Sequence, residues 1–121
     1  MSARTRAFLE AAGAGDVRQA LDVCSALLNE CPDSPYLLVW RAILIQAQDD
    51  PASALTLEDA EQSLLRAYGT DANYLPALEE LAHFYDAVEP DAMKARKYAR
   101  EYLEKSYAVV HQLREIVEKA S

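Results

Sequence analysis

Residues 13–34 read GAGDVRQALDVCSALLNECPDS, a helix-forming segment with a turn signal at each end. The glycines at its start and Pro32 near its end punctuate the chain, because neither residue type suits a helix interior. Asp16 follows the first turn and can accept a backbone N–H of the helix that begins there. The sequence therefore predicts a helix over residues 16–30.

Similar turn signals divide the rest of the chain into helical segments. Turn signals recur at residues 49–53, 69–71 and 89–91, and the whole chain has only three glycines. Ser34 precedes a proline suited to a first helical turn, and Thr56 has Asp59 three residues on, an acidic variant of the capping box. No strand pattern competes, so we expect helices at about 3–13, 16–30, 35–48, 57–68, 72–87 and 91–119.

Short connections between successive helices force antiparallel hairpins. The sequence thus predicts an all-α protein of about six helices in three antiparallel hairpins, forming a single domain over residues 1–121. Small residues on leucine-rich faces would let paired helices approach to about 8 Å, and these residues are Ala20, Ala42, Ala60 and Ala82.

Two of the hairpins carry a recurring spacing. Gly15, Ala20 and Pro32 lie where a turn, a close helix crossing and a closing bend would fall, and a pattern of large, large, small and aromatic residues follows at Leu78, Leu81, Ala82 and Tyr85. This spacing resembles the tetratricopeptide repeat, whose period is about 34 residues. The resemblance implies a tetratricopeptide-like α-solenoid with a long C-terminal helix, whose concave face is formed by the first, third and fifth helices and binds proteins.

Charge narrows the choice of partner. Twenty acidic and twelve basic residues give a net charge of −8, which repels the phosphates of nucleic acids and anionic membranes. The chain has no apolar run of about 18 residues and no leader-like start, so we expect a cytoplasmic protein that binds neither nucleic acid nor membrane.

The acids concentrate in the middle of the chain. Residues 49–91 hold eleven acids and one base, Arg66, whereas from Ala92 onward seven bases face four acids. This acidic surface, represented by Glu58, Asp59 and Glu61, is either a solvated face or one that matches a basic partner.

Cys24 and Cys31 lie seven residues apart on one expected helix, about 10 Å along its axis. A disulfide needs Cα atoms within about 7 Å, so we expect two buried free thiols. Among the aromatic residues, Trp40 and Tyr85 are expected in the core, and Tyr36 is as compatible with a surface as with a core position.

The most site-like cluster is Glu79, His83 and Asp86, at helical spacing on one expected helix. Such residues hold a divalent ion when a second helix supplies a matching pair, and none does here. The chain also lacks a nucleophile motif, a phosphate loop and a paired-carboxylate signature. We therefore expect no metal, no cofactor and no enzymatic activity, and we interpret the three side chains as lining a groove.

These observations favour an adaptor or scaffold that binds a segment of another protein on its concave or acidic face. The expected lining consists of Tyr36, Val39, Ile43, Glu79, His83 and Asp86. The alternative is a dedicated stoichiometric binder, such as an immunity protein against a basic toxin or a chaperone for a secreted effector. A metal-dependent enzyme built on the cluster around His83 is the remote third hypothesis.

The last helix is longer than its hairpin partner can cover. An apolar stripe runs along it through Ala92, Ala95, Ala99, Tyr102, Val109, Leu113 and Ile116. The half beyond Tyr107 must bury this stripe, together with Val110 and Val117, either by bending back near Ser106 as a cap or by pairing with a second copy. Of the two we favour the homodimer.

Overall fold

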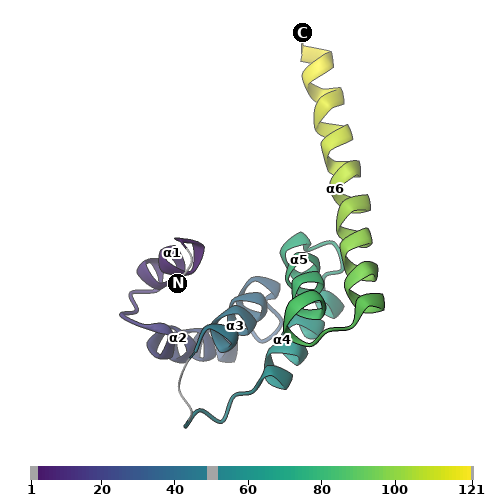
Figure 1. Cartoon of the computed structure of the whole chain (residues 1–121). Coiled ribbons are helices and arrows are strands. Elements are labelled where there is room, and N and C mark those ends of the chain that lie inside the picture. Colours follow the sequence, from purple (N-terminus) through teal and green to yellow (C-terminus); the bar gives the residue numbers. More distant parts are fainter. Residues whose placement is uncertain (1–2, 49–51, 121) are drawn as a thin grey trace. The chain divides into compact units, whose positions relative to one another are not determined.

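The computed structural model describes residues 3–48 and 52–120, and these residues form helices joined by turns, with no strand among them (Figure 1). This confirms the predicted all-α class with six helices. In chain order the six α-helices are α1 (Ala3–Ala11), α2 (Val17–Glu30), α3 (Pro35–Ala47), α4 (Leu57–Thr70), α5 (Leu75–His83) and α6 (Ala92–Ala120). A π-helical turn, η1 (Phe84–Val88), follows α5 directly.

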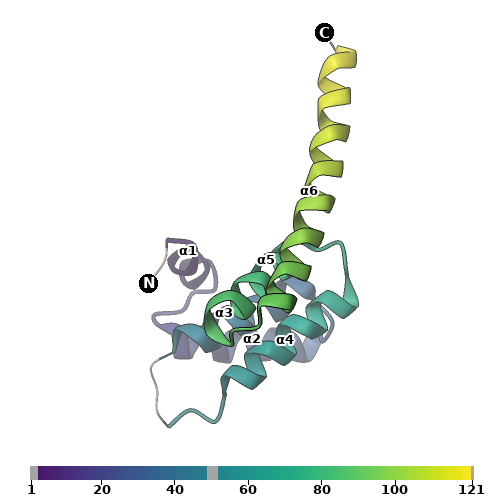
Figure 2. The ribbon, with the colours of Figure 1, turned by 45° about the vertical axis from the view of Figure 1, so that its right-hand side comes forward.

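The chain folds as two compact units, unit 1 (Met1–Asp71) with α1 to α4, and unit 2 (Ala72–Ser121) with α5, η1 and α6. In unit 1, α3 packs against both α2 and α4, and in unit 2, α5 packs against α6 (Figure 2). The single domain and the tetratricopeptide-like solenoid expected from the sequence stay predictions.

Local capping explains where three helices begin. Asp16 Oδ1 accepts from the backbone N–H of Gln19 at 2.9 Å at the start of α2. Ser34 Oγ accepts from the backbone N–H of Leu37 at 3.3 Å at the start of α3. Thr56 and Asp59 form the predicted capping box at the start of α4. Each bond satisfies a backbone donor that the helix itself leaves unpaired, so all three predicted caps are confirmed.

The fifth helix begins later than predicted, at Leu75 instead of residue 72. Pro76 lies in its first turn, where a missing backbone N–H costs nothing. At its other end the helix widens into η1, which closes with a bond from the backbone N–H of Glu89 to the carbonyl oxygen of Phe84 at 2.9 Å. The sequence pattern does not indicate this π-helical turn.

The core of unit 1 is centred on α3, which is buried on most of its circumference. Trp40 is 8% exposed and stacks on Phe8 of α1 with ring centroids 4.3 Å apart. In unit 2, Tyr85 is buried and stacks on Tyr98 of α6 at 5.9 Å. Both aromatic residues predicted for the core are therefore confirmed there.

Two expectations need correction. Cys24 is buried but Cys31 is exposed, because Cys31 follows the last turn of α2 instead of facing α3. Ala82 is only half-buried and borders open grooves, whereas Ala20, Ala42 and Ala60 have no exposed surface. Of the four predicted alanines, the three of unit 1 therefore lie in closed helix contacts.

Ala20→Leu should lower the free energy of unfolding by about 1–3 kcal/mol, since a closed helix contact cannot absorb the added volume. Ala26→Leu is the matched control, because Ala26 is exposed on the same helix and its replacement should change stability by less than about 0.5 kcal/mol. Urea denaturation followed by circular dichroism measures both. Equal stability of the two variants would contradict the close packing of α2 at Ala20.

Candidate functional site

The predicted lining residues lie in both units, three on α3 of unit 1 and three in unit 2. On α3 of unit 1, Tyr36 is 50% exposed, Ile43 is half-buried and Val39 is only 3% exposed. Phe8 of α1 lies against this part of α3, with its ring 6.3 Å from that of Tyr36. Tyr36 therefore offers the largest surface of the three, and Val39 belongs to the core.

In unit 2 the predicted cluster borders one side of the α5–α6 hairpin. A groove of about 400 Å³ is lined by His83 and Asp86 together with Arg96 of α6 and four alanines, Ala82, Ala92, Ala95 and Ala99. A second hollow of about 310 Å³ is lined by Glu79, Ala82, His83, Ala99, Tyr102 and Leu103. The structure thus brings the three residues of the cluster to one alanine-rich surface, here named the alanine groove.

Across residues 3–48 and 52–120 no group of three or more His, Cys, Asp or Glu side chains is arranged to hold a metal ion. The arrangement around His83 offers polar atoms beside small apolar side chains, which suits contact with another polypeptide.

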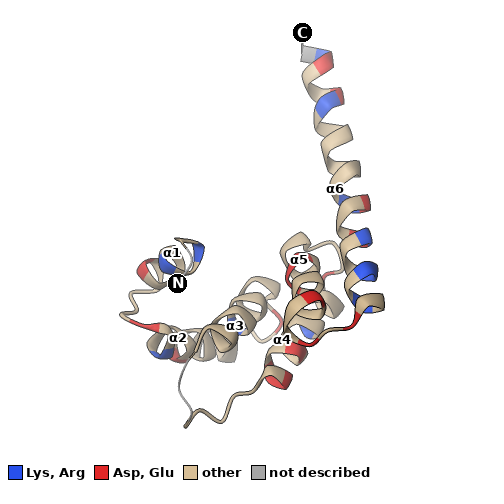
Figure 3. Ribbon diagram, viewed as in Figure 1, with Lys and Arg blue, Asp and Glu red and all other residues tan. Residues whose placement is uncertain are grey.

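Acidic residues lie at the start of α4, coloured red in Figure 3. Asp59 Oδ2 accepts from the backbone N–H of Thr56 at 2.8 Å and from its hydroxyl at 3.2 Å, and these bonds lower the pKa of the Asp59 carboxyl. Acids in the first turn also complement the positive end of the helix dipole. Glu58 is exposed and Glu61 half-buried, while Asp49 and Asp50 of the predicted acidic surface lie outside the described residues.

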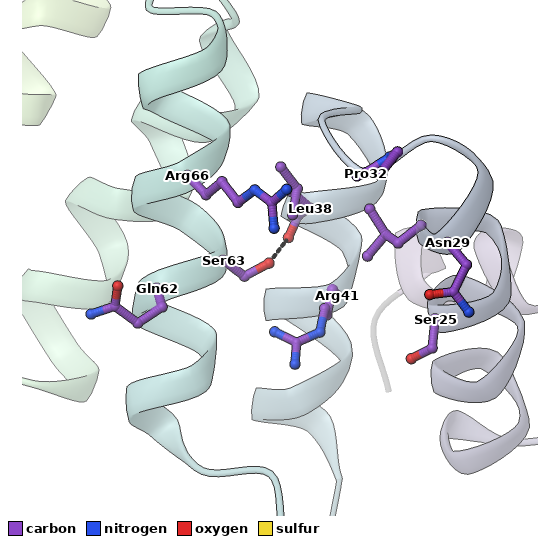
Figure 4. A pocket seen from close by; sticks show the side chains of 9 residues that line it. Ser25, Asn29, Pro32, Leu38, Arg41, Gln62, Ser63 and Arg66 are labelled. Carbon is purple, nitrogen blue, oxygen red and sulfur yellow. Dashed lines mark hydrogen bonds between the residues drawn. The ribbon is translucent and has the colours of Figure 1, made fainter.

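A further pocket, of about 470 Å³, lies between α2, α3 and α4 in unit 1 (Figure 4). Leu28, Pro32 and Leu38 are its apolar lining residues, and Ser63 Oγ donates to the carbonyl oxygen of Leu38 at 2.6 Å, tying α4 to α3. The polar lining residues are Ser25, Asn29, Arg41, Gln62, Ser63 and Arg66. We name this the arginine pocket.

Two arginines give the arginine pocket its positive charge. Between Gln19 and Met93 the chain has fourteen acids and only two bases, and both bases, Arg41 and Arg66, line this one pocket. Arg41 Nη1 donates to the backbone carbonyl of Asp59 at 3.4 Å, and Arg66 Nη2 bonds Asp33 Oδ1 at 3.1 Å. The sequence shows that bases are scarce in this region. That Arg41 and Arg66 line the same pocket depends on the packing of α3 against α4.

The distal half of α6 is exposed on every side. The helix continues without interruption past Ser106, so the bend considered from the sequence is absent. From Tyr107 to Val117 the large apolar side chains are 45–73% exposed. Figure 2 shows this half running beyond the end of α5.

No protein-family model, no curated protein and no solved structure matches the chain. No helix among the described residues has the length and apolar character that crossing a membrane requires.

Proposed function

We propose that the protein is a non-enzymatic protein–protein interaction module, an adaptor that binds a carboxylate-bearing segment of a partner protein in the arginine pocket. The main support for the proposal is that Arg41 and Arg66 both line one pocket in an otherwise acidic region of the chain. Guanidinium groups bind carboxylates through paired, charge-assisted hydrogen bonds.

Both guanidinium groups keep donors for a ligand. Each has five N–H groups, of which Arg41 uses one on a backbone carbonyl at a long 3.4 Å. The ion pair of Arg66 with Asp33 is solvent-exposed, with side chains 55% and 74% accessible, so it contributes little and yields readily to a competing carboxylate.

The neutral side chains suit a peptide. Asn29 of α2 and Gln62 of α4 lie on opposite walls, and their amides can both donate to and accept from a peptide backbone. A doubly charged phosphate fits less well, because Asp33 at the rim and the net charge of −8 oppose it more strongly than a carboxylate.

The acidic surface supplies a second contact. Glu58 lies four residues before Gln62 and therefore on the same side of α4. A partner segment with a carboxylate for the arginines and a nearby basic residue for Glu58 would match both charges. This proposal joins the basic partner expected from the acidic surface to the arginine pocket.

The proposal includes three further expectations from the sequence. The hairpins are taken as tetratricopeptide-like, the protein is placed in the cytoplasm, and α6 is taken as a self-association element that makes the adaptor a homodimer. A two-fold adaptor presents two peptide pockets, which raises its effective affinity for a partner with two binding segments.

Selection of random displayed peptides on the intact protein tests the proposed function. We expect selected peptides to contain Asp, Glu or a free C-terminal carboxylate, and their binding to fall at least about tenfold in Arg41→Gln and in Arg66→Gln, since a hydrogen bond to a charged group contributes about 1.5–3 kcal/mol. Arg18→Gln is the matched control, because Arg18 is exposed on α2 and does not line the pocket.

Replacing the peptide's acid by its amide separates the two sources of the carboxylate, side chain and C-terminus. Selected peptides without any carboxylate, bound equally by the parent and both arginine variants, would refute the proposed site.

A further inference from the structure

The distal half of α6 has one apolar and one polar side. Val109, Val110 and Leu113 are 46%, 45% and 56% exposed, and Ile116 and Val117 are 61% and 67% exposed. At 100° per residue these five side chains occupy one arc of the helix, while His111, Arg114, Glu115 and Glu118 occupy the opposite arc. Removing these half-exposed apolar side chains from water is favourable, so this arc, the distal stripe, favours a partner surface.

The proximal half of the same helix borders a hollow lined by small side chains, whereas the distal half projects large ones. Ala92, Ala95 and Ala99 of α6 and Ala82 of α5 border the alanine groove. Alanine side chains allow another helix to approach closely, and large side chains from that helix would fill the hollow. The alanine groove therefore suits a helix with large apolar residues.

The groove and the stripe follow one continuous line. Successive positions 92, 95, 99, 102, 106, 109, 113 and 116 alternate steps of three and four, the spacing of a helix that pairs with another over its whole length. The line begins with small residues and ends with large ones. Two copies aligned in opposite directions would set the large residues of each against the small residues of the other.

The charges select the same direction. The first turns of α6 carry Lys94, Arg96, Lys97 and Arg100 without an acid among them, visible as the blue start of α6 in Figure 3. Near the end of α6 two acids, Glu115 and Glu118, balance two bases, Arg114 and Lys119. Antiparallel pairing sets the basic start of each copy against the charge-balanced end of the other. Parallel pairing would set the four bases against the same four bases.

We infer that two copies of the chain pair antiparallel along α6, with the distal stripe of each copy filling the alanine groove of the other. This inference deepens the proposed self-association and does not depend on the arginine pocket. The 29 residues of α6 span about 43 Å, so a strip about 10 Å wide covers on the order of 400 Å² per copy. The two copies together would bury about 800 Å², less than the roughly 1,000 Å² of stable specific interfaces, so we expect a weak dimer that dissociates at micromolar concentrations.

Light scattering over a concentration series tests the pairing. The intact chain should change from monomer to dimer with rising concentration, and Leu113→Glu combined with Ile116→Glu should remain monomeric up to at least 100 times the parent's dissociation constant. Ala108→Glu with His111→Glu adds the same two acidic residues on the polar arc and should dimerise like the parent.

Ala99→Trp fills the groove without touching the distal stripe and should also weaken dimerisation at least about tenfold. Circular dichroism of each variant verifies that α6 stays helical. A parent that remains monomeric at several hundred micromolar, or variants that all dimerise equally, would overturn the inference. Peptide binding in the arginine pocket should persist in the monomeric variant, so failure of either proposal is recognised separately.

Pyrene excimer fluorescence determines the direction. With Cys31 replaced by serine and Cys24 buried, pyrene is attached at a cysteine introduced by Lys119→Cys or by Lys94→Cys. An antiparallel pair separates two labels at position 119, so each labelled protein alone should give no excimer, and the mixture should give one. An excimer from the Lys119→Cys protein alone would show parallel pairing and overturn the inference.

Discussion

Phe84→Ala is expected to remove about 3–5 kcal/mol from the free energy of unfolding. Phe84 is 1% exposed, is among the largest fully buried side chains, and meets Tyr85 edge to face at 5.3 Å. It also begins η1, so the substitution leaves a cavity beside the π-helical turn. Since small domains unfold with about 5–15 kcal/mol, the loss is a large part of the total.

Urea denaturation measures this loss, and Met93→Ala is the control because Met93 is 83% exposed on α6. The control should stay within about 0.5 kcal/mol of the parent. Both variants are best compared in the Leu113→Glu and Ile116→Glu background, because pairing would add a concentration-dependent contribution. Equal unfolding midpoints for the two variants would contradict the core of unit 2.

The starts of α2, α3 and α4 could be predicted because each depends on residues that are neighbours in the sequence. Asp16, Ser34 and Thr56 all bond a backbone N–H three residues on. Such contacts form within one turn and need no tertiary information. The same reasoning fails at α5, whose N-cap residue Tyr74 makes no side-chain cap bond.

Whether a side chain is buried depends on packing between helices and is harder to predict from neighbouring residues than a helix cap. Tyr36 and Val39 lie one turn apart on α3, yet one is half exposed and the other is core. The sequence placed both on a binding face, because α3 has apolar residues on most of its circumference and its pattern gives no direction. Only its packing between α2 and α4, with Phe8 of α1 against it, separates surface from core.

In the candidate sites, too, features within one helix could be predicted and features that depend on two helices could not. Glu79 and His83 of α5 and Asp86 of η1 border overlapping hollows, which their spacing along the chain made it possible to anticipate. Arg41 and Arg66 are 25 residues apart, and their pocket exists only because α3 and α4 pack side by side. The sequence identified Arg66 as the only base among eleven acids, but periodicity within one helix cannot connect it to another helix.

The two thiols should differ in alkylation rate by at least about 1,000-fold. Cys31 is exposed, whereas Cys24 has no exposed surface, and its Sγ donates to the carbonyl oxygen of Leu37 at 3.3 Å. Burial raises the pKa of the Cys24 thiol above its ordinary value of 9.0, and the positive charge of Arg41 offsets only part of that rise. The reactive thiolate is therefore both inaccessible and disfavoured at Cys24.

Cys24 can react only when unit 1 opens. For an opening free energy of about 5 kcal/mol, fewer than about one molecule in 1,000 is open at any moment, which sets the expected ratio. Iodoacetamide labelling at neutral pH, followed by mass spectrometry of the two cysteine peptides, measures it. In guanidinium chloride the two rates should become equal, which controls for local sequence effects.

The direction of the pKa shift also fixes the effect of alkaline pH. A thiol whose pKa is raised on folding stabilises the folded state fully below its ordinary pKa, and this contribution is lost as pH rises through the folded pKa. Stability should therefore fall above about pH 9, and Cys24→Ala should reduce that fall while leaving labelling at Cys31 unchanged. Labelling of Cys24 within tenfold of Cys31 at neutral pH would mean that α2 and α3 do not pack closely around this thiol.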